Sequence, residues 1–114
     1  AASDVYKRQL LQEGVTALIA GDSMMTAGAL EACHNAGKRI GEEIALVGFD
    51  DFIYLRFQPS PISVVDQDVA RMGETATAKL IAAINEKHQP EGEVLETRYI
   101  PRMSTAHQLD GATP

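Results

Sequence analysis

The sequence predicts an α/β fold, in which a parallel β-sheet is flanked by helices on both faces. Short and nearly continuous apolar runs at residues 16–21, 44–49 and 62–66 alternate with longer amphipathic stretches. Runs of this kind are typical of strands covered on both faces, and such strands occur mostly in parallel sheets. Right-handed crossovers between parallel strands would then place the intervening helices on the two faces of the sheet.

The first amphipathic stretch, residues 23–36, predicts a helix with a close-packing face of small side chains. Either Asp22 or Ser23 can cap its first amide groups, and Gly37 stands where a left-handed residue commonly ends a helix. The residues predicted to face the core are Met25, Ala29, Ala32, Cys33 and Ala36.

The second amphipathic stretch, residues 68–87, predicts a longer helix that ends before Pro90. Residues 93–105 predict a last extended segment, and Pro101 favours an edge strand there because proline has no amide hydrogen to donate. The stripe expected to pack along the long helix consists of Val69, Gly73, Ala76, Leu80 and Ile84.

The chain is expected to hold a single lobe. Its 114 residues match the ordinary size of one compact domain and leave no room for two lobes with a cleft between them. Residues 1–9 show no periodicity, so we interpret them as a flanking segment whose origin, native or foreign, the sequence leaves open. Residues 10–105 are expected to form the lobe, and residues 106–114 a flexible tail.

Composition and charge exclude several classes of function. The chain has 10 Lys and Arg against 16 Asp and Glu, and its net charge of -6 has the wrong sign for a protein that grips DNA unaided. No apolar run approaches the roughly 18 residues of a membrane span. Cys33 is the only cysteine, and the three histidines lack ligand spacing, so we predict no disulfide, metal site or cofactor.

Two carboxylates follow apolar runs directly. Asp22 comes after the first run and Asp50 after the second, so both should lie at the carboxyl edge of a parallel sheet, where ligands of such sheets bind. Ionised carboxylates only accept hydrogen bonds, which favours a neutral ligand that offers donors, such as sugar hydroxyls or the amino groups of a nucleobase. The alternative is purely structural: Asp22 caps a helix and Asp50 starts a turn.

A weaker hypothesis is that this edge is catalytic, because it holds three carboxylates, Asp22, Asp50 and Asp51. General acid–base work would need an apolar pocket that raises the pKa of one carboxyl group, and the turn after Asp50 is polar. No catalytic residue is therefore predicted.

A cluster of large apolar side chains follows the second carboxylate within a short segment. These side chains either fold back onto the end of the sheet or form a contact with another subunit. Two further residues on the first predicted helix lie off its core face and could extend such a contact into one exposed patch. The complete candidate patch is Met24, Ala27, Phe52, Tyr54, Leu55 and Phe57.

Four motifs stand in one order along the chain: GD opening a helix that continues with GAL, the turn VGFDD, the run PSPISVVDQ followed by MGETA, and a closing R-x-S-T. Residues 14–105, which contain them, closely resemble the C-terminal effector-binding lobe of LacI/GalR-type transcription regulators. The resemblance implies a periplasmic-binding-protein-like fold and a cytoplasmic, non-enzymatic protein. It also implies a homodimer that contacts DNA through a headpiece not present in this sequence.

The resemblance also assigns residues. Asp22 and Asp50 match positions that hydrogen-bond a small effector, although many relatives carry Asn at the position of Asp22. Gln67 matches the crossover, or hinge, between two lobes, and the candidate patch matches the dimer contact. Secreted sugar-binding proteins share the fold and are the alternative, although the P-x-P-I-S and M-G arrangement is closer to the regulators. The sequence does not name the effector or the operator.

Overall fold

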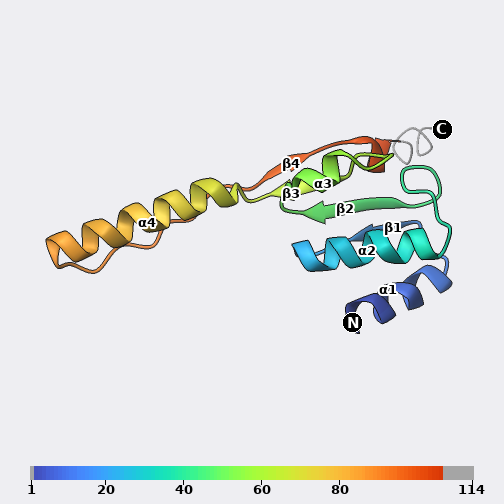
Figure 1. The fold of residues 1–114 in the computed structure, drawn as a ribbon, viewed down its shortest axis with the longest axis horizontal. Coiled ribbons are helices and arrows are strands. Elements are labelled where there is room, and N and C mark those ends of the chain that lie inside the picture. The colour runs from blue at the N-terminus through green and yellow to red at the C-terminus, as the bar shows by residue number, and fades with distance from the viewer. Residues whose placement is uncertain (1, 107–114) are drawn as a thin grey trace.

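A four-stranded open sheet forms the body of the molecule in the computed structural model, which describes the backbone of residues 2–106 and the side chains of residues 7–106. The strands β1, β2 and β3 are parallel, and β4 pairs with β3 in the antiparallel direction at one edge (Figure 1). The predicted α/β class with a mostly parallel sheet is confirmed. The strands, in spatial order, are β1 (Ala17–Ile19), β2 (Ala45–Phe49), β3 (Ser63–Asp66) and β4 (Arg98–Ile100).

Two helices pack together beside the sheet. Helix α2 (Ser23–Asn35) contacts β2, and helix α1 (Ala2–Gln12) contacts α2 (Figure 1). The side chain of Lys7 in α1 donates a hydrogen bond to the carbonyl oxygen of Met25 in α2. The core that these elements enclose is apolar and consists of Leu11, Leu18, Ala29, Ala32, Cys33, Ile44, Leu46, Leu55, Ile62 and Val64.

Most of the predicted flanking segment is helical. Helix α1 begins at Ala2, and Lys7 within it is buried. Leu11, which is buried in the core, lies inside the predicted lobe. Of the predicted tail, residues 107–114 lie outside the described part of the chain.

The buried face of α2 also differs from the predicted one. Met25 and Ala36 are exposed, whereas Thr26 and Gly28 are buried. Thr26 can be buried because its hydroxyl group is fully hydrogen-bonded, as described below, and a buried polar group with partners carries little penalty. The buried face of α2 therefore consists of Thr26, Gly28, Ala29, Ala32 and Cys33.

Helix α4 (Val69–Glu86) forms as predicted but does not cover a face of the sheet. It projects away from the body, and residues 88–97 run back along it (Figure 1). The radius of gyration is 17.9 Å, against about 13 Å for a compact chain of this length. No residue of α4 is buried, and Val69, Leu80 and Ile84 of its apolar stripe are exposed.

The end of the described chain is only partly extended. Strand β4 is confined to Arg98–Ile100, and residues 103–106 are helical, so the prediction of an extended segment up to residue 105 is wrong. Pro101 directly follows the strand, and β4 is an edge strand, as predicted from the missing amide hydrogen. The chain can turn here because serine side chains bond the backbone of the turn.

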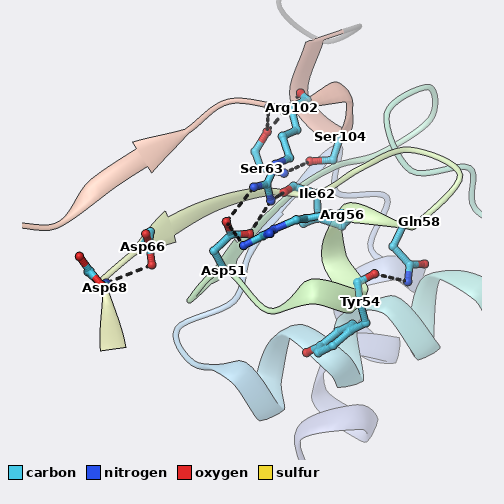
Figure 2. Close-up of polar contacts among 10 residues, drawn as sticks. All are labelled: Asp51, Tyr54, Arg56, Gln58, Ile62, Ser63, Asp66, Asp68, Arg102 and Ser104. Atoms are coloured by element: carbon cyan, nitrogen blue, oxygen red, sulfur yellow. Dashed lines mark hydrogen bonds and ion pairs between the residues drawn. The ribbon is translucent and has the colours of Figure 1, made fainter. Parts of the chain in front are cut away.

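Those bonds form a seam between the end of the chain and the sheet. The hydroxyl of Ser104, which is fully buried, accepts from the amide of Ser63 at 2.8 Å and donates to the carbonyl oxygen of Leu46 at 2.6 Å. The hydroxyl of Ser63 in turn accepts from the amide of Arg102 at 2.7 Å. These bonds join β2, β3 and the residues after β4 (Figure 2).

A bidentate ion pair completes the seam. The guanidinium group of Arg102 donates to both carboxylate oxygens of Asp51, at 2.7 and 2.9 Å, and also to the carbonyl oxygen of Ile62 at 3.0 Å. Arg56 adds a third contact to Asp51 at 3.1 Å (Figure 2). Hydrogen bonds from Arg102 lower the pKa of the Asp51 carboxyl group despite its partial desolvation, and Arg56 lowers that pKa further.

We predict that this ion pair makes the stability of the protein fall in acid. Because the pKa of Asp51 is lower in the folded than in the unfolded chain, its contribution is complete above the unfolded value of about 4 and is lost as the pH falls through the lower folded value. Urea unfolding between about pH 5 and pH 2 should show a steep loss in the wild type and a shallower one in Asp51→Asn, which starts from a lower stability. Equal slopes in the two proteins would contradict the assignment.

Candidate functional site

The carboxyl ends of β1 and β2 meet at one edge of the sheet. Ile19 of β1 lies in register with Val47 of β2, and the amide of Ala20 donates to the carbonyl oxygen of Val47 at 2.9 Å. The two parallel strands thus end side by side, and Asp22 and Asp50 both follow at this edge. The predicted placement of the two residues at the carboxyl edge is therefore what the topology produces.

Asp22 caps helix α2. Its backbone is extended, with φ -156°, and its Oδ1 accepts a hydrogen bond from the amide of Met25 at 2.7 Å. The capping interpretation is therefore confirmed. The residue is exposed, and a carboxylate carries a second oxygen that can accept from a ligand while the first holds the cap.

Asp50 is held in an uncommon backbone conformation at the end of β2. Its φ is 66°, in the left-handed region that aspartate tolerates better than most residues. Its amide donates to the carbonyl oxygen of Val65 at 2.8 Å, and its Oδ1 accepts from Nε2 of Gln67 at 3.0 Å. The half-buried carboxylate is thus aimed by its own backbone and by Gln67.

Gln67, the predicted hinge residue, lies where the chain leaves the sheet for α4. The crossover is a turn of two aspartates: the amide of Asp68 donates to Oδ1 of Asp66 at 3.0 Å (Figure 2), and Asp68, with φ 51°, caps α4 by accepting from the amide of Arg71 at 3.2 Å. Since Gln67 reaches back to Asp50, the structure connects the crossover directly to the candidate ligand edge.

Asp51 does not belong to this edge. Both of its carboxylate oxygens accept from Arg102, as described above, so the hypothesis of a catalytic group of three carboxylates loses one member. Arg102 was not predicted as the partner of Asp51, although it lies in the R-x-S-T motif. Asp51 and Arg102 are so distant in sequence that no local sequence pattern indicates their bidentate ion pair.

The candidate patch is largely exposed, with one exception. Met24 is 78% exposed and Phe57 79%, Ala27 is also exposed, and the rings of Phe52 and Tyr54 stack with centroids 5.9 Å apart. Leu55 is the exception: it is fully buried within the core, and its backbone bonds the amide of Ile62. Its assignment to a subunit contact is therefore wrong, because helix α3 (Ile53–Arg56) turns this side chain inward.

Other features do not add to the site. A hollow of about 360 Å³ at the far end of α2 is lined by His34, Ile40, Gln58 and Ile62 among others, and its lining includes neither Asp22 nor Asp50. No helix in the described residues is long and apolar enough to span a bilayer.

The chain is similar to known proteins over most of its length. The family model of the periplasmic binding protein-like domain matches residues 1–105. Among curated proteins, an uncharacterized helix-turn-helix transcriptional regulator from the aml 5' region of Streptomyces limosus is 31% identical over 103 residues, which is 90% of this chain and 29% of the relative. The chain thus spans about three tenths of that regulator.

Solved structures of regulators have the same fold. A dimeric Lac repressor with an 11-residue C-terminal deletion superposes with a TM-score of 0.75 at 25% identity, over 90% of this chain and 38% of that one. A complex of the transcriptional regulator CelR with cellobiose gives 0.76 at 28% identity, over 90% of this chain and 32% of that one. The chain therefore belongs to the periplasmic binding protein-like domain family, and it is similar in sequence and fold to part of several transcriptional regulators.

Proposed function

We propose that the carboxyl edge formed by Asp22 and Asp50 is half of a binding site for a small neutral effector, a sugar or a nucleobase-like molecule. The carboxylate of Asp50, held by Gln67 and by its left-handed backbone, is the observation that carries this proposal. A carboxylate that is already oriented loses little freedom when a ligand donates to it. Asp22 adds a second acceptor on the neighbouring strand end.

The charge of the edge supports a neutral ligand. Asp22, Asp50 and the crossover aspartates are all acceptors when ionised, so an anionic ligand would be repelled, whereas hydroxyl or amino groups can donate to them. Cellobiose in the CelR complex is such a donor-rich molecule. A sugar is therefore the first class to test, and a nucleobase the second.

The contact between Asp50 and Gln67 supplies a route from ligand to conformation. A ligand that donates to Asp50 competes with Gln67 for the same carboxylate, and Gln67 lies in the segment that directs α4 away from the sheet. An effector would then shift the balance between two orientations of α4 relative to the lobe, provided that it binds one orientation more tightly. No enzymatic step is required in this scheme.

The exposed stripe of α4 fits a role in a longer protein. Val69, Leu80 and Ile84 leave an apolar face open along the helix, and such a face normally packs against another element. Since the chain spans about three tenths of its curated relative, we propose that this face packs against a second lobe, which supplies the other half of the ligand site.

The patch of Met24, Ala27, Phe52, Tyr54 and Phe57 is proposed as the contact of a homodimer. Its members come from the first turns of α2 and from the segment around α3, and they are exposed although most of them are large and apolar. The protein proposed here is a cytoplasmic regulator that reaches DNA through a headpiece outside this sequence, rather than a secreted sugar-binding protein. The helix-turn-helix description of its relative supports that choice.

We predict that Asp50→Asn weakens effector binding at least about tenfold, the effect of losing one charge-assisted hydrogen bond. Asparagine is chosen because it also tolerates the left-handed backbone, so the fold is retained. Binding by the full-length protein is measured as a rise in melting temperature with cellobiose, lactose, adenine and guanine, followed by calorimetry with each compound that gives a shift.

Glu31→Gln is the matched control for this experiment, because it neutralises an exposed carboxylate on the same helix that Asp22 caps. It should bind as the wild type does. Failure of all four compounds to shift the wild type, or equal affinity of Asp50→Asn and the wild type, would overturn the proposed site.

For the dimer contact, we predict that Phe57→Glu raises the dimer dissociation constant at least about tenfold, since it buries a charge in an apolar interface. Sedimentation velocity of the full-length protein over a concentration series measures this constant. Val94→Glu, at another exposed apolar position outside the patch, is the control. A dissociation constant unchanged in Phe57→Glu would exclude the patch as the contact.

A further inference from the structure

We propose that Thr26 is the positioning residue of the ligand edge: its hydroxyl group fixes the residue before Asp50 to the backbone of Asp22. The proposal rests on the proposed function, because it gives the two aspartates one shared support. It is carried by two hydrogen bonds, one between Thr26 and the backbone before α2 and one between Thr26 and β2.

The hydroxyl of Thr26 bridges the ends of two strands. It donates to the carbonyl oxygen of Asp22 at 2.7 Å and accepts from the amide of Phe49 at 3.1 Å. The side chain is fully buried, so solvent does not compete for either bond. One oxygen atom therefore connects the backbone of Asp22, just after β1, to that of Phe49, the last residue of β2.

The amide of Phe49 needs this partner because β1 ends early. The next amide, that of Asp50, donates to Val65 of β3, so the amide of Phe49 points to the opposite side, toward β1. Strand β1 stops at Ile19 and no longer offers a carbonyl oxygen there. Thr26 takes the place of the missing strand residue, and Asp50 leaves the sheet from an anchored position.

Gly48 allows the approach that makes the bridge possible. A Cβ atom on residue 48 would lie 2.7 Å from Cγ2 of Thr26, well inside van der Waals contact. Helix α2 can therefore come close to β2 only because residue 48 has no side chain. The pairing of Gly48 with Thr26 is thus part of how the edge is built.

The consequence for binding is a fixed spacing between two acceptors. A ligand that donates to both Asp22 and Asp50 gains most when their separation is set before it arrives. Without the hydroxyl bridge, the end of β2 and the first turn of α2 can shift independently, and the position of Asp50 relative to Asp22 is no longer fixed. Helix α2 also carries Met24 and Ala27, so the same bridge connects the ligand edge to the proposed dimer contact.

The test compares Thr26→Val with Thr26→Ser in the full-length protein. Valine keeps the shape and the methyl group but replaces the hydroxyl with a second methyl, whereas serine keeps the hydroxyl and removes the methyl. Hydrogen exchange of the Phe49 amide should be at least about tenfold faster in Thr26→Val and near the wild-type rate in Thr26→Ser, because only serine retains an acceptor for that amide. Thr16→Val, at an exposed threonine, is the control.

Affinity for cellobiose, measured by calorimetry, is the second readout. Thr26→Val should bind at least about tenfold more weakly than the wild type and Thr26→Ser within about threefold. Unchanged exchange of the Phe49 amide in Thr26→Val, equal affinity of Thr26→Val and the wild type, or a serine variant as impaired as valine would each overturn the proposal. A wild type that binds none of the four compounds, with the exchange pattern as expected, would instead overturn the proposed function and leave the bridge intact.

Discussion

The ion pair between Arg102 and Asp51 closes the sheet around a long excursion of the chain. The polypeptide leaves β3 at Asp66, runs out along α4 and returns only at Arg98, and an excursion of that length costs entropy when its ends are brought together. The pairing of β3 with β4 opposes that cost, and the bidentate contact at Arg102, with Ser63 and Ser104 beside it, fastens the returning end. This fastening holds the returning strand close to the crossover at Gln67.

The sequence predicted the elements better than their contacts. Strands β1, β2 and β3 each lie inside an apolar run, because the apolar composition of a strand can be read from the local sequence. Helix α4 was predicted as readily as the strands, but an amphipathic stripe indicates only that a helix packs against another element. That its face lies open depends on partners which the local sequence does not encode. Asp51 and Arg102 were beyond reach for a related reason, since a contact between distant residues has no periodicity.

The same distinction applies to the candidate site: the two aspartates were predicted, and the contacts that support them were not. Asp22 and Asp50 were found because both follow apolar runs, and the topology does bring those strand ends to one edge. The support beneath them was missed. Thr26 was overlooked because periodicity assigns the core face by apolarity, which favoured its neighbour Met25. A threonine can nevertheless be buried as readily as a methionine when its hydroxyl group both donates and accepts a hydrogen bond, as that of Thr26 does. Leu55 was misassigned because the short helix α3 turns this side chain into the core while its apolar neighbours stay exposed.

The backbone conformation at residue 50 restricts how this edge can diversify. With φ at 66°, a side chain branched at Cβ would be strained there, whereas glycine, asparagine and aspartate enter at low cost. Changes of ligand preference that keep this fold are therefore favoured, at that position, when they exchange the charged acceptor for an amide or delete the side chain. Wider variation in ligand chemistry must come from other positions at this edge of the sheet, where the backbone conformation does not restrict the residue type.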